Sequence, residues 1–318
     1  MLQNRSELLF LYDVQWANPN GDPVDENKPR IDEETGRNIV TDVRLKRTIR
    51  DYLYDYCHQE IFVREIAGEN EYIQDAKMRA EDFLVKDGEK LDKSKLSLAE
   101  MKRIINEEIL RQCIDVRLFG VTLPIEKNAK EKSSITHTGP VQFKMGQSLH
   151  AVKLEYIKGT GAFASGSGMM QKTFREEYVL PYSLIAFYGV INETAAAYTK
   201  LTEEDVQLLF DAMWNGTKNL ISRSKAGQIP RLLLRVVYKE KHFHIGELDK
   251  YISLHSEKVD EEIRDVSDYI LDTAPLIRVM EKQKEKIERV EIKKNDRLVC
   301  SEDIIESLKA AGIPVEIK

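Results

Sequence analysis

The segment from Asn18 to Arg50 constrains the fold more than any other part of the chain. It begins with Asn-Pro-Asn-Gly-Asp-Pro and soon continues into Thr-Asp-Val-Arg-Leu-Lys-Arg-Thr-Ile-Arg. Pro19 and Pro23 lack backbone donors and Asn-Gly-Asp tolerates positive φ, so the first part predicts a loop that is neither helix nor strand. Thr41 or Asp42 is placed to cap a helix over the second part.

At 3.6 residues per turn this helix has an apolar face and a basic face. A row of fixed cations beside a polar loop suits a phosphate backbone. A basic helix on its own is more often an ordinary solvated surface, so that interpretation stays open. The apolar face holds Leu45, Ile49, Tyr52 and Tyr56, and the basic face holds Lys46, Arg47 and Arg50, with Arg44 at its flank.

The loop and helix together resemble the start of the backbone subunit of type I CRISPR effector complexes (Cascade). That subunit belongs to the repeat-associated RNA-binding superfamily, and the resemblance is greatest to its type I-B branch. It extends in order over most of residues 5–240, and the last part of the chain adds little to it. Four further segments carry it: Asp115–Gly120, Thr138–Phe143, Tyr178–Tyr182, and Ser222–Lys225 leading into Pro230–Val236.

Size and composition set the broad class. A chain of 318 residues can bury a substantial core, in one elaborated domain or two small ones. Cys57, Cys113 and Cys300 form no CxxC pair, which indicates neither a zinc site nor a disulfide framework and favours a reducing cytoplasm. The N-terminus lacks signal-peptide organisation. The longest apolar run, Val179–Ile191, is too short for a membrane span and predicts a strand, so no membrane partner is expected.

The net charge of −6 argues against a nucleic-acid partner when it is taken alone. The distribution of the charges reverses this interpretation. Residues 128–175 contain seven Lys or Arg against two Glu, and residues 215–241 contain seven against one. Local positive fields on an acidic protein fit a subunit that holds RNA in a groove.

The predicted fold class is α+β, with a modified ferredoxin-like or RRM-like core. Its order of elements is strand, helix, strand, strand, helix, strand, interrupted by insertions. The RNP1 signature of RNA-recognition motifs is absent, so binding through the loops and the first helix is expected rather than through the sheet face. The expected strands are Glu7–Gln15, Val141–Leu149, Tyr178–Asn192 and Arg231–Tyr238, and the other expected helices are Leu96–Cys113 and Glu203–Asn215.

We expect four regions. Residues 1–59 and 136–240 form the palm, and residues 60–135 form a mainly helical insertion, the fingers. Residues 241–318 form a charged extension that completes or flanks the palm, and its part from 249 to 294 is helical in tendency. The resemblance implies a projecting thumb hairpin at residues 146–177, which folds across the CRISPR RNA bound to a neighbouring subunit.

The glycine-rich segment Lys158–Thr173 nearly matches a phosphate-binding P-loop, but Gln171 occupies the place of the second glycine. A mobile hairpin or loop is the better interpretation. Within the implied thumb, Phe163, Met169, Met170 and Lys172 are expected to meet the RNA. The methionine pair beside Phe163 suits this role, because soft, unbranched side chains can wedge against bases without sequence preference. Packing of this loop onto its own domain is the alternative.

A related backbone subunit of type III effectors cuts target RNA, and this is the rival function. Asp22, Asp25 and Asp32, with Asp13 on the preceding strand, could in principle hold a catalytic metal. Aspartate beside glycine and proline is ordinary turn chemistry, however. The six histidines show no HExxH spacing, and no GxSxG is present. We therefore expect no catalytic residue, metal or cofactor.

The resulting expectation is a non-catalytic subunit that polymerises along a CRISPR RNA and presents it to target DNA. Its partners would be further copies of itself, the large subunit, a repeat-handle-binding subunit, a repeat-processing endonuclease and a recruited nuclease-helicase. Binding would be largely independent of sequence, as phosphate contacts are. The residues expected to contact RNA are Asn18, Asn20, Gly21, Thr41, Arg44, Lys46, Arg47, Arg50, Gln142, Phe163, Met169, Met170, Lys172, Ser222, Arg223 and Lys225.

Overall fold

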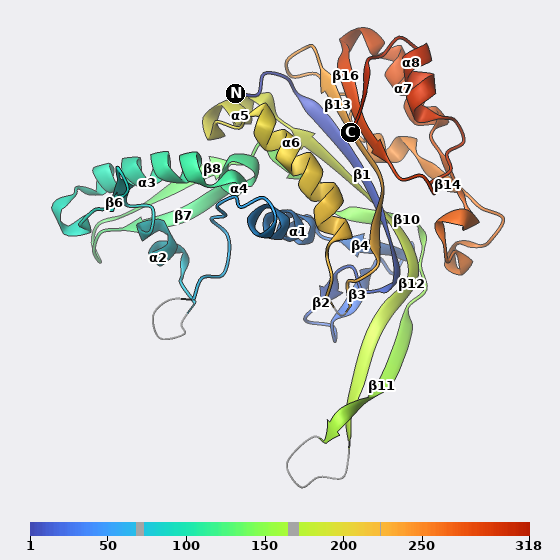
Figure 1. Ribbon diagram of the computed structural model, residues 1–318, viewed down its shortest axis with the longest axis horizontal. Helices are drawn as coiled ribbons and strands as arrows, with labels where there is room; N and C mark the ends of the chain where they lie inside the picture. The colour runs from blue at the N-terminus through green and yellow to red at the C-terminus, as the bar shows by residue number, and fades with distance from the viewer. Residues whose placement is uncertain (68–72, 165–171, 223) are drawn as a thin grey trace.

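The computed structural model describes residues 1–67, 73–164, 172–222 and 224–318. A single eleven-stranded sheet forms its centre, with layers of structure on both faces (Figure 1). The protein is therefore of mixed α and β structure, as the sequence predicts. None of the helices in the described part of the chain combines the length and the apolar character that crossing a membrane requires.

The middle of the sheet is antiparallel. Strand β1 pairs with β12 on one side and with β13 on the other, and β9 and β10 both pair with β12. The chain runs from β1 through a helix to β9 and β10, then through β12 and two more helices to β13. The bounds are β1 Ser6–Ala17, α1 Asp42–Asp55, β9 Val141–Phe143, β10 Gly146–Ala151, β12 Lys172–Ile191, α5 Glu193–Thr199, α6 Glu203–Asp211 and β13 Gln228–Tyr238.

One face of the sheet is covered by α1, α5 and α6 (Figure 1). Alternate residues of β1, such as Phe10 and Tyr12, point to this face and pack with Ile49 of α1, Phe187 of β12 and Phe210 of α6. Helix α1 therefore lies with its apolar side on the sheet. The N-terminus of α1 lies at the edge of the sheet, beside the loop that follows β1.

The opposite face is covered by the C-terminal part of the chain. The helical tendency expected over 249–294 is found only in part: α7 is a helix, but β14, β15 and β16 are strands. Strand β16 extends the sheet beside β13, and β17 pairs in parallel with β16. Strand β16 is rich in charged residues, so its sequence does not indicate a buried strand. One of these charges, Glu291, is nevertheless buried and pairs with buried Arg235. The bounds are β14 Ser253–His255, β15 Ile270–Asp272, α7 Ala274–Lys282, β16 Ile287–Lys294, α8 Ile304–Ala310 and β17 Val315–Ile317.

Residues 60–138 form a separate lobe with its own core, which includes Phe62, Phe83 and Ile105. Its longest helix is the expected one, and a capping box of Ser97 and Glu100 fixes its start. The lobe also contains the antiparallel pair β7–β8, a strand content that the sequence pattern did not predict. The bounds are α2 Ala76–Glu81, β5 Val85–Lys86, β6 Glu89–Lys90, α3 Leu98–Gln112, α4 Ile114–Phe119, β7 Gly120–Glu126 and β8 Lys132–Thr138.

A long hairpin projects from the sheet (Figure 1). It consists of β11, Glu155–Ala164, and the first half of β12, paired antiparallel from Glu155 and Val179 outward. The loop after β1 lies near its base, since the Tyr178 hydroxyl donates to Glu26 at 3.0 Å. That loop is not wholly irregular as expected, because β2, Gly21–Asp22, pairs with β3, Lys28–Ile31, which in turn pairs with β4, Arg37–Val40.

Candidate nucleic-acid interface

The loop after β1 is fastened to the start of α1. Thr41 is the N-cap of the helix, and its hydroxyl accepts from the backbone N–H of Arg44. Both the backbone N–H and the hydroxyl of Thr41 donate to Asn20 Oδ1 at 2.9 Å. The Asn20 side chain therefore positions the loop against the helix terminus, where backbone donors and the helix dipole favour an anion.

Asn18 joins the same loop to the segment before β13. Its side chain is buried, and Nδ2 donates to the Asn27 backbone oxygen at 2.7 Å. Its backbone N–H donates to the Ser224 oxygen at 2.7 Å, and its own oxygen accepts from Lys225 Nζ at 3.0 Å. Asn18 thus builds the site from inside rather than presenting its amide to solvent.

Gly21 is required by close packing. A Cβ at this position would come within 2.0 Å of Asn27 Oδ1 and 2.7 Å of the Asn27 backbone oxygen. Asn27 itself has a left-handed φ of 58°, which asparagine tolerates better than most residues. Sequence reasoning missed Asn27 and Ser224 as parts of the site, although an asparagine in a turn between two short strands was an available signal.

Arg44 and Lys225 are the central pair of cations. Both are half-buried, and within the described residues neither side chain forms an ion pair with a carboxylate. Burial lowers the pKa of Arg44, and burial together with the Arg44 charge lowers the pKa of Lys225 to about 8. Two partly desolvated cations that repel each other, neither with an ion-pair partner among the described residues, favour the binding of an anion.

The other cations of α1 are occupied. Arg50 Nε donates to buried Asp115 at 3.0 Å, and Lys46 Nζ pairs with Asp42 at 2.9 Å. Both side chains also lie over the ring of Phe119, at 5.1 and 5.6 Å from its centroid. The cations expected to form one row therefore differ in their surroundings: Lys46 and Arg50 are paired with acids, whereas Arg44 has no ion-pair partner among the described residues and its charge acts on Lys225.

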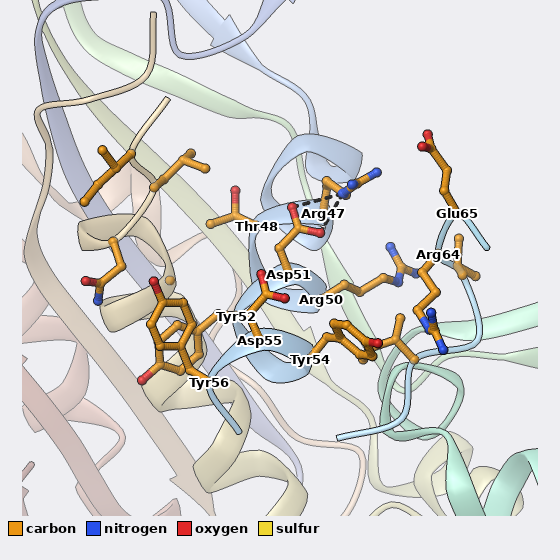
Figure 2. A pocket seen from close by; sticks show the side chains of 16 residues that line it. Arg47, Thr48, Arg50, Asp51, Tyr52, Tyr54, Asp55, Tyr56, Arg64 and Glu65 are labelled. Atoms are coloured by element: carbon orange, nitrogen blue, oxygen red, sulfur yellow. Dashed lines mark hydrogen bonds and ion pairs between the residues drawn. The ribbon is translucent and has the colours of Figure 1, made fainter. Parts of the chain in front are cut away.

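Arg47 is exposed and lines a cavity of about 420 Å³ beside α1. Its Nε donates to both carboxylate oxygens of Asp51, at 2.7 and 3.0 Å (Figure 2). Arg64 and Tyr54 line the same cavity, with the guanidinium 4.6 Å from the ring centroid. Arg47 can exchange its exposed partner for a phosphate at low cost, because such pairs contribute little.

The remaining predicted residues do not all meet at this site. Ser222 is exposed in the turn that carries Lys225. Gln142 pairs with Val190 of β12, whereas the loop side of β1 pairs at Leu180. At about 3.3 Å per residue, Gln142 is roughly 30 Å further along that strand. Met169, Met170 and Arg223, and the side chains of Phe163 and Lys172, lie outside what the structure describes.

The aspartates of the rival function have other partners. Asp13 is buried between the Arg231 guanidinium at 2.6 Å and the Tyr182 hydroxyl at 2.7 Å, and burial raises the pKa of its carboxyl. Asp22 accepts from the Val24 backbone and pairs with Arg30. Among the described residues no group of three or more His, Cys, Asp or Glu is arranged to hold a metal ion. Asp25 pairs with Lys28, and Asp32 accepts from Thr35 at the end of β3.

Comparison with known proteins identifies related chains. Residues 4–274 match the family model of CRISPR-associated protein Cas7. A protein of Haloferax volcanii described as CRISPR-associated protein Cas7 is 34% identical over 334 aligned positions, which cover 97% of this chain and 94% of that protein.

Solved structures share the fold. A chain of a structure titled "CRISPR RNA-guided surveillance complex, pre-nicking" superimposes with a TM-score of 0.54 at 14% identity, covering 96% of this chain and 100% of the other. A chain of a second "CRISPR RNA-guided surveillance complex" gives a TM-score of 0.50 at 11% identity, covering 97% and 98%. At these identities the likeness concerns the fold.

Proposed function

Because the chain belongs to the CRISPR-associated Cas7 family, we propose that it is the RNA-binding backbone subunit of a CRISPR surveillance complex. Successive copies line up along one CRISPR RNA and hold it by its sugar–phosphate chain. The guide bases stay free to pair with target DNA, so the protein itself needs no sequence preference.

The observation that carries this proposal is the cation pair of Arg44 and Lys225. Lys46, Arg47 and Arg50 of α1 each pair with an acid, whereas Arg44 and Lys225 have no ion-pair partner within the described residues. They adjoin the N-terminus of α1 and the ordered loop that Asn18 and Asn20 hold in place. A phosphate at this point would meet two positive charges and helix-terminal backbone donors.

The topology supports a finer assignment of the fold. The strand order β13, β1, β12, β10 places the four main strands as fourth, first, third and second in chain order. We assign this as the ferredoxin-like palm expected from the sequence, extended by β16 and β17. The lobe of residues 60–138 corresponds to the fingers, and the β11–β12 hairpin to the thumb that reaches a neighbouring subunit.

The partner set follows from the same assignment. The complex would be a type I-B Cascade in the cytoplasm, with a large subunit, a repeat-handle-binding subunit and a repeat-processing endonuclease. Destruction of target DNA would fall to a recruited nuclease-helicase. The backbone subunit would have no catalytic role, since Asp13 and Asp22 are engaged by Arg231 and Arg30.

Isolation of the native complex tests the proposal. The protein is purified with an affinity tag from cells that express its natural companions, and the bound nucleic acid is sequenced. We expect small CRISPR transcripts at several protein copies per RNA. A preparation that contains the companion proteins but no such transcript would refute the proposal.

A cleavage assay distinguishes the non-catalytic backbone function from the rival endoribonuclease function. The purified complex is incubated with complementary target RNA and Mg²⁺ or Mn²⁺. We expect the target to stay intact. Cleavage that disappears in an Asp22→Ala variant would establish the rival endoribonuclease function.

A further inference from the structure

Trp16 combines two unusual features at the end of β1. Its side chain is 56% exposed, whereas Trp214, the chain's only other tryptophan, is buried. Its backbone φ is 49°, in the left-handed region. A bulky residue is a genuine outlier there, because its Cβ crowds the backbone. Such strain persists only where the surroundings impose it, and it is concentrated at functional sites.

Both neighbours of Trp16 are held in place. Gln15 pairs with Tyr182 of β12, and its Nε2 donates to the Arg264 backbone oxygen at 3.0 Å. Ala17 pairs with Leu180 and is buried in the core under the helices. The backbone is therefore held on both sides of Trp16.

The backbone of Trp16 lies close to that of Asn18, which contacts one cation of the pair. Asn18, two residues further along, accepts the hydrogen bond of Lys225 Nζ. Consecutive Cα atoms are about 3.8 Å apart, so the Cα atoms of Trp16 and Asn18 lie within about 8 Å of each other. A base attached to a nucleotide whose phosphate binds Arg44 and Lys225 is within reach of a side chain as large as indole.

We propose that Trp16 is a stacking platform for one base of the RNA strand whose phosphate is held by Arg44 and Lys225. The inference rests on the proposed RNA-binding function and assigns a base contact to a site otherwise made of phosphate contacts. Every nucleobase has a π-face, so the contact is tolerant of sequence and compatible with any guide. Tryptophan has only two rotatable side-chain bonds, so ordering it on binding costs little conformational entropy.

Trp16 fluorescence provides a direct readout. In a Trp214→Phe background Trp16 is the only tryptophan, and it is titrated with oligoadenylate RNA and with a length-matched abasic sugar–phosphate oligomer. Binding of both is followed independently by anisotropy of a terminal dye. We expect strong quenching by the RNA and little by the abasic oligomer at equal occupancy. Equal responses to the two, or none, would overturn the inference.

Substitutions separate stacking from a structural role. Trp16→Phe should keep RNA affinity within a few-fold, and Trp16→Ala should lose about tenfold, the size expected of one stacked base. Trp16→Gly relieves the left-handed strain, so it should bind RNA as weakly as Trp16→Ala without melting earlier than the parent protein.

The outcomes are distinct. A Trp16→Gly protein that melts earlier but binds RNA normally marks a structural residue and overturns the inference. Normal RNA binding with impaired self-association assigns the indole to a contact between copies and also overturns it. If the parent protein binds neither oligomer, the proposed function itself fails.

Discussion

A partly buried lysine that feels the charge of a nearby arginine, and has no ion-pair partner among the described residues, is an unfavourable arrangement for a folded protein. Desolvation and like-charge repulsion both disfavour the charged forms, which is why the pKa of Lys225 falls to about 8. Cations in such surroundings cluster at functional sites, because a ligand supplies the missing charge. At the residue scale, Arg44 and Lys225 are therefore the residues on which the proposed RNA binding depends.

The pH dependence of RNA binding follows from Lys225. In the protein without RNA, the Lys225 side chain loses its proton above about pH 8. A bound phosphate favours the charged form and raises this pKa, so binding takes up a proton above pH 8 and affinity falls as the pH rises. If phosphate restores a pKa of about 10.5, affinity should drop about tenfold between pH 7 and 9. Anisotropy with oligoadenylate measures this, since adenine does not titrate in that range.

Lys225→Arg is the control, because arginine stays charged throughout this range. The variant should bind with a much flatter pH profile. A wild-type profile as flat as that of Lys225→Arg would show that protonation of Lys225 is not coupled to RNA binding.

The sequence could single out the loop and the basic helix, but not which cations are available. Arg50 and Lys46 share a helix face with Arg47, yet Asp115, 65 residues from Arg50, takes Arg50 into a buried pair. Likewise Arg231 and Arg235 counted toward a positive segment, but Asp13 and Glu291 neutralise them in the interior. Such partners lie far apart along the chain and come together only in the tertiary fold.

At the scale of elements, Asp115 ties α1 to the lobe of residues 60–138. Its carboxylate accepts from Arg50 Nε and from the backbone N–H groups of Phe62 at 2.8 Å and Val63 at 3.1 Å. Helix α1 is thereby anchored on two sides, by its apolar face on the sheet and by Arg50 on the lobe. This anchoring fixes the position of the helix that carries Arg44.

Asp115→Ala should destabilise the protein by about 3 kcal/mol, because it leaves a largely buried guanidinium and two amides without their acceptor. Asp51→Ala removes an exposed partner, that of Arg47, and should cost no more than about 1 kcal/mol. Urea denaturation compares the two. Equal stabilities of the two variants would contradict the anchoring role of Asp115.

The projecting hairpin should be dispensable for folding but needed for assembly. Residues 158–176 are replaced by Asn-Gly, which joins the paired positions Ile157 and Glu177 in a tight turn and preserves the register below. The shortened protein should melt within a few degrees of wild type. Size-exclusion chromatography of the co-expressed complex should then show impaired assembly, whereas normal assembly would contradict the thumb assignment.

The sequence pattern located the principal elements well where hydrophobic periodicity was strong, as in β1, β12 and α3. It was only partly right over 249–294, where β16 reads Ile-Glu-Arg-Val-Glu-Ile-Lys-Lys. Two of its five charged side chains neutralise charges on neighbouring elements: Glu291 pairs with Arg235 of β13, and Arg289 pairs with Glu203 of α6. The composition of such a strand is typical of a surface helix. Its strand structure depends on the elements that pair with it in the fold.

At the scale of the whole molecule, both faces of the central sheet are covered, one by α1, α5 and α6 and the other by the C-terminal layer (Figure 1). An RNA strand therefore has no access to the sheet face used by typical RNA-recognition motifs. The accessible positive site lies at the edge, where the loop after β1, the start of α1 and the turn carrying Lys225 meet. The net charge of −6 is compatible with this arrangement, since the site depends on two local cations rather than on the total.

The salt dependence of RNA binding by an Arg44→Gln/Lys225→Gln protein tests this account most directly. The matched control is Arg103→Gln/Lys309→Gln, which removes the same charge from exposed, paired positions on α3 and α8. Losing two phosphate contacts should weaken affinity at least tenfold and reduce the slope of log affinity against log salt by about 1.4, with the control unchanged. An unchanged slope and affinity in the Arg44/Lys225 variant would contradict the account.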